Sequence, residues 1–142
     1  VTNRSISGET TAGGRSRLGP ALKAHQPAIV VIALGANDGL RGLPLGQMRD
    51  NLNAMISAAR SSGARVVMAG MRLPPNYGPY ATDFFGSFKS IAQQQKVPLI
   101  DFLLEPIVAR PQLFQADNLH PLAEAQPLLV DHVWPALAPL LK

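Results

Sequence analysis

Asp117 and His120 are the side chains in this sequence best suited to proton transfer, and they stand three residues apart. In acyl transfer, a histidine accepts a proton at one ring nitrogen while a carboxylate holds the other. An Asp and a His at this spacing in a tight turn can meet locally, so the pair can orient itself. A D-x-x-H pattern is short enough to arise by chance, so it needs support from the rest of the chain.

Asn37 and Asp38 form a second group of candidates, because they directly follow the apolar run at residues 28–34. Seven consecutive apolar residues rich in Ile and Val predict a strand buried on both faces, which is typical of a parallel sheet covered by helices. In open parallel sheets, ligands bind outside the carboxyl ends of the strands. We therefore expect Asn37 and Asp38 at an active site, although Gly, Asn and Asp are equally typical of a plain turn.

The other elements alternate between helix and strand along the chain. Hydrophobic spacing and turn residues predict a strand tail in residues 1–8, helices over residues 11–24, 45–59, 84–92 and 128–137, strands over residues 65–69 and 97–102, and a short helix over residues 105–110. This alternation predicts an α/β fold with right-handed crossovers.

The composition indicates one globular domain and argues against several classes of partner. The chain has 142 residues, of which 46% are hydrophobic and 15% charged, and it contains no Cys. No stretch approaches the roughly 18 apolar residues of a membrane span. The net charge of +4 is spread along the chain without a Lys/Arg run, so nucleic-acid binding has little support. His25 and His132 lack the spacing of metal ligands, so we interpret both as surface or structural residues.

Three separated blocks together resemble a known family. They are Ser5-Ile6-Ser7-Gly8-Glu9-Thr10, Gly35-Ala36-Asn37-Asp38-Gly39-Leu40-Arg41-Gly42 and Asp117-Asn118-Leu119-His120-Pro121. In order and approximate separation they resemble consensus blocks two, three and five of the SGNH (GDSL-type) serine hydrolases. The stretches Leu73-Pro74-Pro75-Asn76-Tyr77-Gly78 and Ala125-Gln126-Pro127 sharpen the resemblance to the bacterial thioesterase I, lysophospholipase and arylesterase subgroup.

The resemblance implies a role for each matched residue. His120 would be the general base and Asp117 its orienting partner, while the Gly8 N–H and the Asn37 amide would form the oxyanion hole. Asp38 would fix its loop rather than take part in the reaction. The substrate loop, resembling the mobile loop that lines the acyl-chain site in this subgroup, consists of Leu73, Pro74, Pro75, Asn76, Tyr77 and Gly78. Within it, we expect Tyr77 either to contact substrate or to pin the loop by packing.

The resemblance also implies a fold and a departure from the family pattern. The fold would be a flavodoxin-like three-layer α/β/α domain over residues 1–142, with a parallel sheet ordered 2-1-3-4-5. The Gly-Asp-Ser-Leu block that carries the nucleophilic serine does not occur in this sequence. We therefore expect an N-terminally incomplete domain without its first, central strand, and hence unpaired backbone groups. Ser7 is a weak substitute, because its block position is that of the oxyanion loop.

The expected function is that of a serine esterase, thioesterase or lysophospholipase acting through an acyl-serine intermediate, without metal or cofactor. The alternatives are a carbohydrate acetylesterase of the same superfamily and a non-catalytic acyl- or lipid-binding remnant. The expected partners are a small-molecule acyl ester or thioester and an N-terminal fragment that completes the sheet. Neither nucleic acid nor stable membrane insertion is expected. The resemblance implies a periplasmic or secreted protein.

Overall fold

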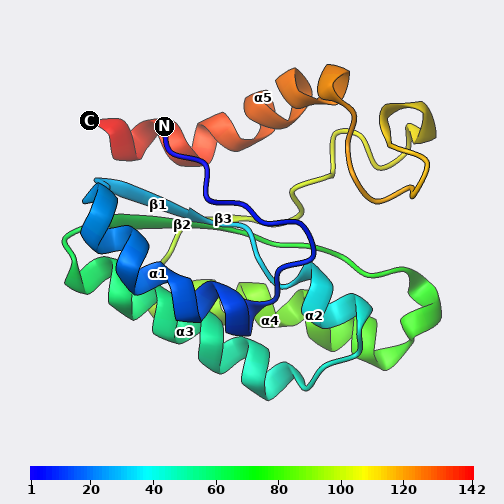
Figure 1. The fold of residues 1–142 in the computed structure, drawn as a ribbon. Helices are drawn as coiled ribbons and strands as arrows, with labels where there is room; N and C mark the ends of the chain where they lie inside the picture. Colours follow the sequence, from blue (N-terminus) through cyan, green and yellow to red (C-terminus); the bar gives the residue numbers. More distant parts are fainter.

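The computed structural model describes all 142 residues and places a parallel three-stranded sheet at the centre of three layers (Figure 1). The strands are β1 (Ile29–Ile32), β2 (Arg65–Ala69) and β3 (Leu99–Ile100), in the spatial order β1-β2-β3. Val31 lies opposite Val67, and Met68 lies opposite Leu99. The α/β fold with a parallel sheet predicted from the sequence is confirmed.

Helices cover both faces of the sheet. On one face lie α1 (Thr11–His25), α3 (Leu45–Ser61) and α4 (Pro79–Gln95), and on the other lies α5 (Gln126–Leu137). The single-turn helix α2 (Ala36–Leu40) lies at the end of the sheet where the strands finish (Figure 1). Four short 3-10 turns complete the elements: η1 (Pro75–Tyr77), η2 (Pro111–Leu113), η3 (Ala123–Ala125) and η4 (Ala138–Leu141).

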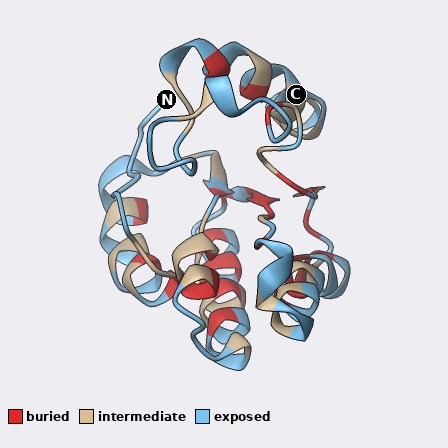
Figure 2. Ribbon diagram, turned by 90° about the vertical axis from the view of Figure 1, so that its right-hand side faces the viewer, coloured by how far each residue is buried: buried red, intermediate tan, exposed pale blue.

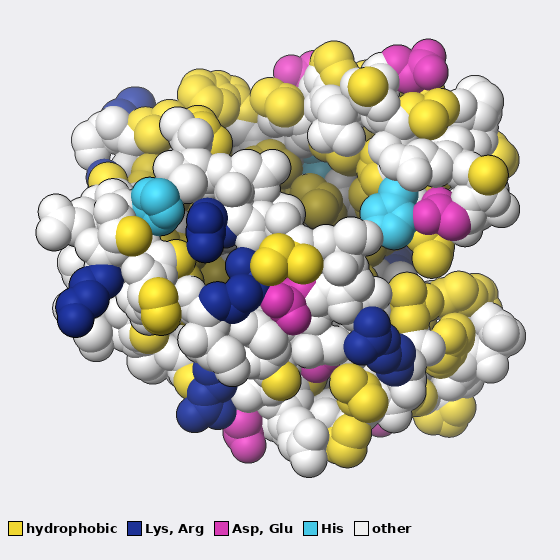
Figure 3. All heavy atoms as spheres, viewed as in Figure 1, with side chains coloured by type: hydrophobic (Ala, Val, Ile, Leu, Met, Phe, Trp, Pro, Cys, Tyr) yellow, Lys and Arg dark blue, Asp and Glu magenta, His cyan; other side chains and the backbone are white.

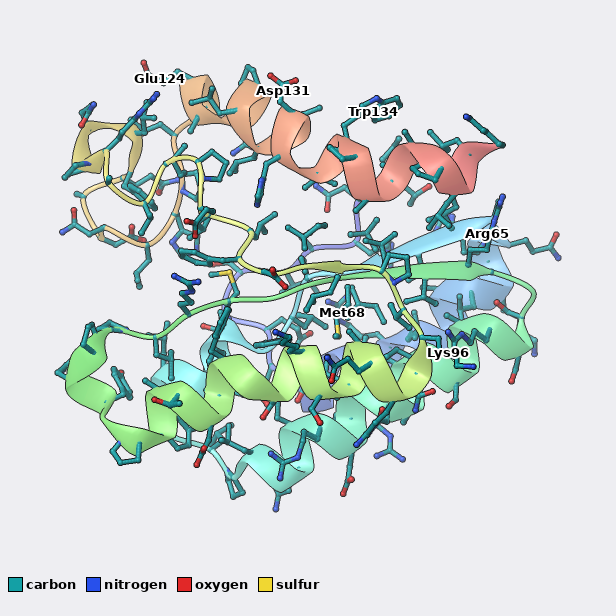
Figure 4. The ribbon with its side chains drawn as sticks, turned by 180° about the vertical axis from the view of Figure 1, so that it is seen from behind. Arg65, Met68, Lys96, Glu124, Asp131 and Trp134 are labelled. Carbon is teal, nitrogen blue, oxygen red and sulfur yellow. The ribbon has the colours of Figure 1, made fainter.

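The main core lies between the sheet and the helices α3 and α4. Its fully buried side chains include Met48, Leu52, Ile56, Phe84 and Phe88, and the two Phe rings meet edge to face at 5.2 Å between centroids. Figure 2 shows these helices buried on their inner sides, and Figure 4 shows Met68 between the sheet and α4. Burying an aromatic or aliphatic side chain of this size contributes about 1.5–3 kcal/mol, so this layer holds the sheet in place.

A smaller cluster joins the opposite face to α5. Val67, Ala69 and Ile100 point toward this layer and pack against Val133 and Leu137 of α5. These contacts come from β2 and β3, so α5 covers only that part of the sheet. The predicted final helix is confirmed, and Pro135 lies within it two residues before its end.

Local sequence signals mark the boundaries of two helices. The Thr10 side chain caps α1 by accepting a hydrogen bond from the Gly13 N–H at 3.4 Å, an arrangement that contributes about 1 kcal/mol. Pro44 precedes α3, and Gly63 follows it with φ +89°, a conformation that favours glycine.

Four local expectations are wrong. Residues 1–8 contain no strand, because no neighbouring strand pairs with them. The strand β3 has only two residues, because Pro98 cannot donate at its start and its partner β2 ends at Ala69, opposite Ile100. Residues 105–110 form turns rather than a helix, with Pro106 and Pro111 restricting that segment. The stretch after β1, expected as a loop, closes into α2, where the Gly39 N–H donates to the Gly35 carbonyl at 3.0 Å.

The expectation that the first strand is buried on both faces is also wrong. Ile32 is buried against the main core, but the Val31 side chain is 46% exposed. Val31 points toward the layer of α5, which packs over β2 and β3 and leaves β1 uncovered. The outer edge of β1 has no strand partner, so the sheet has an open edge there.

A slot with a volume of about 440 Å³ adjoins this open edge. The extended residues 1–5 line one side and β1 lines the other, with Gly14, Leu18 and Leu22 of α1 below. Figure 3 shows this side of the molecule hollowed between its two layers, with hydrophobic side chains inside the hollow. We refer to this cavity as the edge slot.

Candidate active site

Asp117 and His120 form a pair within a single tight turn. The carboxylate Oδ2 lies 2.5 Å from the ring Nδ1, while Oδ1 accepts hydrogen bonds from the backbone N–H groups of Leu119 and His120 at 2.9 and 3.0 Å. Asn118 adopts a left-handed φ of +57°, which residues of its type tolerate, and this closes the turn. One carboxylate therefore fixes both the backbone and the imidazole, as the spacing predicts.

The electrostatics of this pair keep the carboxylate charged. The hydrogen bond from the His120 ring, followed by the two backbone N–H groups, lowers the pKa of Asp117 to about 2. An ionised Asp117 holds Nδ1 as the donor, which leaves Nε2 as the acceptor in the neutral ring. Nε2 has no hydrogen-bond partner, and the His120 side chain is 56% exposed. The arrangement can take a proton from a group that approaches from solvent.

Gly8 lies at the third position of a turn that leaves its N–H free. The Glu9 N–H donates to the Ile6 carbonyl at 3.2 Å, and Gly8 has φ +78°. A positive φ at this position requires glycine in a type II turn. The Gly8 N–H makes no hydrogen bond within the protein, so it can donate to an external oxygen.

The helix α2 holds this turn through two polar side chains. The Asn37 Nδ2 donates to the Glu9 carbonyl at 2.8 Å, which uses one of its two N–H bonds. Asp38 is buried and accepts hydrogen bonds from the Thr11 N–H at 2.8 Å and the Thr11 hydroxyl at 2.6 Å. Asp38 therefore fixes the start of α1 rather than only its own loop, and Asn37 keeps one N–H that makes no hydrogen bond within the protein.

The substrate loop is tied to the same helix. The Tyr77 hydroxyl donates to the Leu40 carbonyl at 3.0 Å, and the ring lies 6.5 Å from that of Tyr80. Leu73 at the start of the loop is buried and lies against Gly39, whose Cβ position would be 3.0 Å from the Leu73 side chain. Of the two roles expected for Tyr77, the structure shows the anchoring one.

Two arginines near the turn were missed by sequence reasoning. Arg41 donates to the Gly8 carbonyl at 3.1 Å, and its position four residues after Asn37 was the available signal. Arg17 pairs with Glu9 at 2.6 Å and donates to the Arg4 carbonyl at 2.8 Å. The Arg17 guanidinium lowers the pKa of Glu9. Both arginines anchor the segment that precedes α1.

No serine hydroxyl of the chain hydrogen-bonds to the His120 imidazole. The hydroxyls of Ser16, Ser62 and Ser87 donate to backbone carbonyls of their own helices. His132 lies 2.9 Å from the Phe102 carbonyl and links α5 to the end of β3, so it is structural. No group of three or more His, Asp or Glu side chains is arranged to hold a metal ion.

These elements all lie at one end of the sheet. The turn at Gly8, the helix α2 and the loop that carries Asp117 and His120 all lie beyond the carboxyl ends of the strands (Figure 1). This is where an open parallel sheet binds ligands. None of the helices combines the length and the apolar character needed to cross a lipid bilayer.

Comparison with known proteins gives consistent matches over nearly the whole chain. A model of the GDSL-like lipase/acylhydrolase family matches residues 1–126. The chain is 48% identical to esterase TesA of Pseudomonas aeruginosa, over 99% of this chain and 71% of that protein. It is 38% identical to thioesterase 1/protease 1/lysophospholipase L1 of Escherichia coli, over 99% of this chain and 68% of that protein. The crystal structure of the psychrotrophic esterase EstA from Pseudoalteromonas sp., inhibited by monoethylphosphonate, superposes with a TM-score of 0.92 at 39% identity, covering 99% of this chain and 77% of that one.

Proposed function

The chain belongs to the GDSL-like lipase/acylhydrolase family, and from this membership we propose that it is a carboxylic ester hydrolase that cleaves acyl esters and thioesters through an acyl-serine intermediate. The observation that carries the proposal is the pairing of Asp117 with His120, which leaves Nε2 free and exposed. A neutral imidazole oriented in this way is the general base of a serine hydrolase.

In the proposed reaction, each residue of the site takes part in a defined step. A serine Oγ attacks the acyl carbon and passes its proton to His120 Nε2, while the Asp117 carboxylate stabilises the imidazolium. The carbonyl oxygen gains negative charge and accepts hydrogen bonds from the Gly8 N–H and the Asn37 Nδ2. His120 then protonates the departing alcohol or thiol. A water molecule, activated in the same way, releases the acid and restores the serine.

We propose that the nucleophile comes from a serine-bearing segment that fills the edge slot. The slot lies between β1, which has an open edge, and the extended residues 1–5, and apolar α1 side chains form its floor. A strand seated there would pair with β1 and end beside the turn at Gly8, at the carboxyl edge of the sheet. With that strand, and with residues 1–5 pairing along its other side as a fifth strand, residues 1–142 would form a single domain of the expected 2-1-3-4-5 order.

The substrate loop at Leu73–Gly78 supports an acyl substrate. The loop consists mostly of apolar residues, and its tether runs to Leu40 in α2, the same helix that carries Asn37. A carbohydrate acetylesterase would need polar groups to bind sugar hydroxyls, and this loop contributes few of them. Hydrolysis of acyl-chain esters compared with acetylated sugars separates these two activities. A periplasmic or secreted location is a separate proposal, which cell fractionation tests.

The central test is ester hydrolysis by the chain with and without its serine-bearing segment. The segment, containing a strand, Gly-Asp-Ser-Leu and a helix, is joined ahead of Val1 or added as a peptide. We expect p-nitrophenyl ester turnover and stoichiometric labelling by a fluorophosphonate only when the segment is present. The matched control carries Ala in place of the Ser of that block.

Two results would contradict the proposal. Efficient turnover and labelling of the 142-residue chain alone would show that a serine within it, Ser7 first, is the nucleophile. A completed chain that binds acyl compounds without forming an acyl-enzyme would identify a non-catalytic acyl- or lipid-binding protein.

A further inference from the structure

The turn at Gly8 is held by hydrogen bonds rather than by packing. Gly8 is exposed, and the only atom within 4 Å of its Cβ position is the Arg41 Nη2, at 3.8 Å. Glycine has more backbone freedom than any other residue. The direction of the Gly8 N–H therefore depends on the groups that hold the neighbouring peptides.

The helix α2 and the residue that directly follows it hold two consecutive carbonyls of this turn. Arg41 donates to the Gly8 carbonyl at 3.1 Å, and Asn37 donates to the Glu9 carbonyl at 2.8 Å. Asn37 lies in α2 and Arg41 caps its end, where the Arg41 N–H donates to the Asn37 carbonyl at 3.1 Å, so the two side chains lie on the same side of the chain. The Glu9 N–H donates to the Ile6 carbonyl at 3.2 Å, so the peptide between Gly8 and Glu9 is held at both its polar atoms.

The guanidinium of Arg41 is not neutralised by a neighbour. The ion pairs of the structure are Arg17 with Glu9, Arg72 with Glu105, and His120 with Asp117, and none involves Arg41. Its positive charge therefore lies next to the glycine whose N–H faces the reacting carbonyl in the proposed reaction. A fixed positive charge at this position favours the developing oxyanion.

We propose that Arg41 is a positioning residue of the oxyanion hole, which orients the Gly8 N–H by clamping the Gly8 carbonyl. This inference rests on the proposed function. The planar peptide that joins Gly8 to Glu9 is held by Arg41 at its carbonyl and by the Ile6 carbonyl at its N–H. With this peptide fixed, the turn keeps Gly8 at φ +78°, and this φ sets the direction of the Gly8 N–H in the preceding peptide. Arg41 is itself exposed, and its loss would return the Gly8 carbonyl to water at small cost in stability. We therefore expect Arg41 to stabilise the transition state of the reaction rather than the folded protein.

The test uses the active form of the chain, joined to its serine-bearing segment, and compares three variants. Arg41→Ala removes the clamp, and Arg41→Lys keeps a cationic donor of similar reach. The control is Arg60→Ala. Arg60 also donates to two carbonyls, those of Gln95 and Lys96, at 2.5 and 3.2 Å. This contact lies at the end of the sheet where the strands begin, as the position of Lys96 in Figure 4 shows.

We expect Arg41→Ala to lower kcat about tenfold, less than the 10²–10³ lost when an oxyanion donor itself is removed. KM should stay within about twofold, and the rate of fluorophosphonate labelling should fall with kcat, because the phosphonyl oxygen occupies the oxyanion hole. Arg41→Lys should recover part of the loss. Arg60→Ala should leave kcat unchanged, and the melting temperatures of the Arg41 variants should match the wild type.

A second measurement does not depend on activity. In ¹⁵N NMR spectra of the same protein, the Gly8 and Glu9 amides should shift in Arg41→Ala and stay in place in Arg60→Ala. Unchanged amides, or a raised KM at constant kcat, would overturn the inference. An inactive and unlabelled wild type would instead refute the proposed function, while the amide shifts would still report on the clamp.

Discussion

The buried residues Asp38 and Thr11 are joined by two hydrogen bonds, since one carboxylate accepts both the backbone N–H and the hydroxyl of the threonine, at 2.8 and 2.6 Å. Asn51 adds a third bond by donating to the same hydroxyl at 3.2 Å. This contact joins the first turn of α1 to α2 and thereby fixes the distance between the Gly8 turn and Asn37.

Asp38→Ala should destabilise the protein by about 2–4 kcal/mol, because it leaves the buried Thr11 donors without a partner. Urea unfolding of the two proteins measures this difference. Asp50→Ala, which removes an exposed carboxylate from α3, is the matched control and should change stability by less than about 0.5 kcal/mol. Equal effects of the two substitutions would show that the Thr11 contact is dispensable.

The Asp117 carboxyl should titrate near pH 2, which NMR of its side-chain carbon can follow. Because the folded-state pKa is lowered, the stability gained from this pair is present above about pH 4 and is lost as the pH falls toward 2. In His120→Ala the pKa of Asp117 should rise, since the imidazole is the largest cause of the shift. An unchanged midpoint in that variant would mean that the backbone donors alone hold the carboxylate.

His120→Ala should reduce kcat of the completed enzyme by several orders of magnitude and leave the domain folded, with a melting temperature lowered only by the loss of the hydrogen bond to Asp117. The imidazole is exposed on a turn and contributes no core contact, so its loss removes the base without unfolding the domain. Stopped-flow ester hydrolysis and thermal unfolding measure the two quantities. Retained activity would assign the base to another residue.

Asn37→Ala should cost about 3–4 kcal/mol of transition-state stabilisation, equivalent to 10²–10³ in kcat. Part of this loss comes from removing the amide N–H that would donate to the oxyanion. The rest comes from releasing the Glu9 carbonyl, which the same amide holds in place. Steady-state kinetics on one ester separates kcat from KM. A change confined to KM would mean that Asn37 binds substrate and transition state equally well.

Tyr77→Phe should loosen the substrate loop without unfolding the chain. It removes one hydrogen bond to the Leu40 carbonyl, so stability should fall by only about 0.5–1.5 kcal/mol. We expect a higher KM for long acyl chains and little change for acetyl esters, which do not reach the loop. The comparison is Tyr80→Phe, which removes a similar hydrogen bond to the Leu43 carbonyl from a tyrosine outside the substrate loop. It tests whether the change in KM depends on the bond made by the loop itself.

The spacing of hydrophobic residues predicted the helices that bury one face. Leu52 and Ile56 of α3 and Phe88 of α4 stand at helical spacing within their own helices and lie in the core, and β2 has the predicted bounds. The exposure of Val31 was not predictable in this way, because it depends on whether a helix covers that strand. The strand expected before Gly8 failed for a similar reason, since a strand exists only with a partner.

In the candidate site too, the local contact was predictable from the sequence and the long-range contacts were not. The Asp117–His120 contact is local, so its spacing was enough to predict it. The Gly8 turn and α2 are 28 residues apart, and the bonds from Asn37 and Arg41 become visible only when the chain is folded. Arg41 lies in the block of residues 35–42 that carries the resemblance, but the resemblance implied no role for it.

The open edge of β1 also bears on how the chain behaves at high concentration. The run Ala28–Leu34 contains no charge, no proline and no bulge, and Val31 adds an exposed apolar surface to its unpaired backbone. Natural sheets protect such edges because they template pairing with other molecules. Wherever the edge slot is empty, β1 is the part of the chain from which intermolecular sheets and aggregates would grow, and occupation of the slot would act as protection against them.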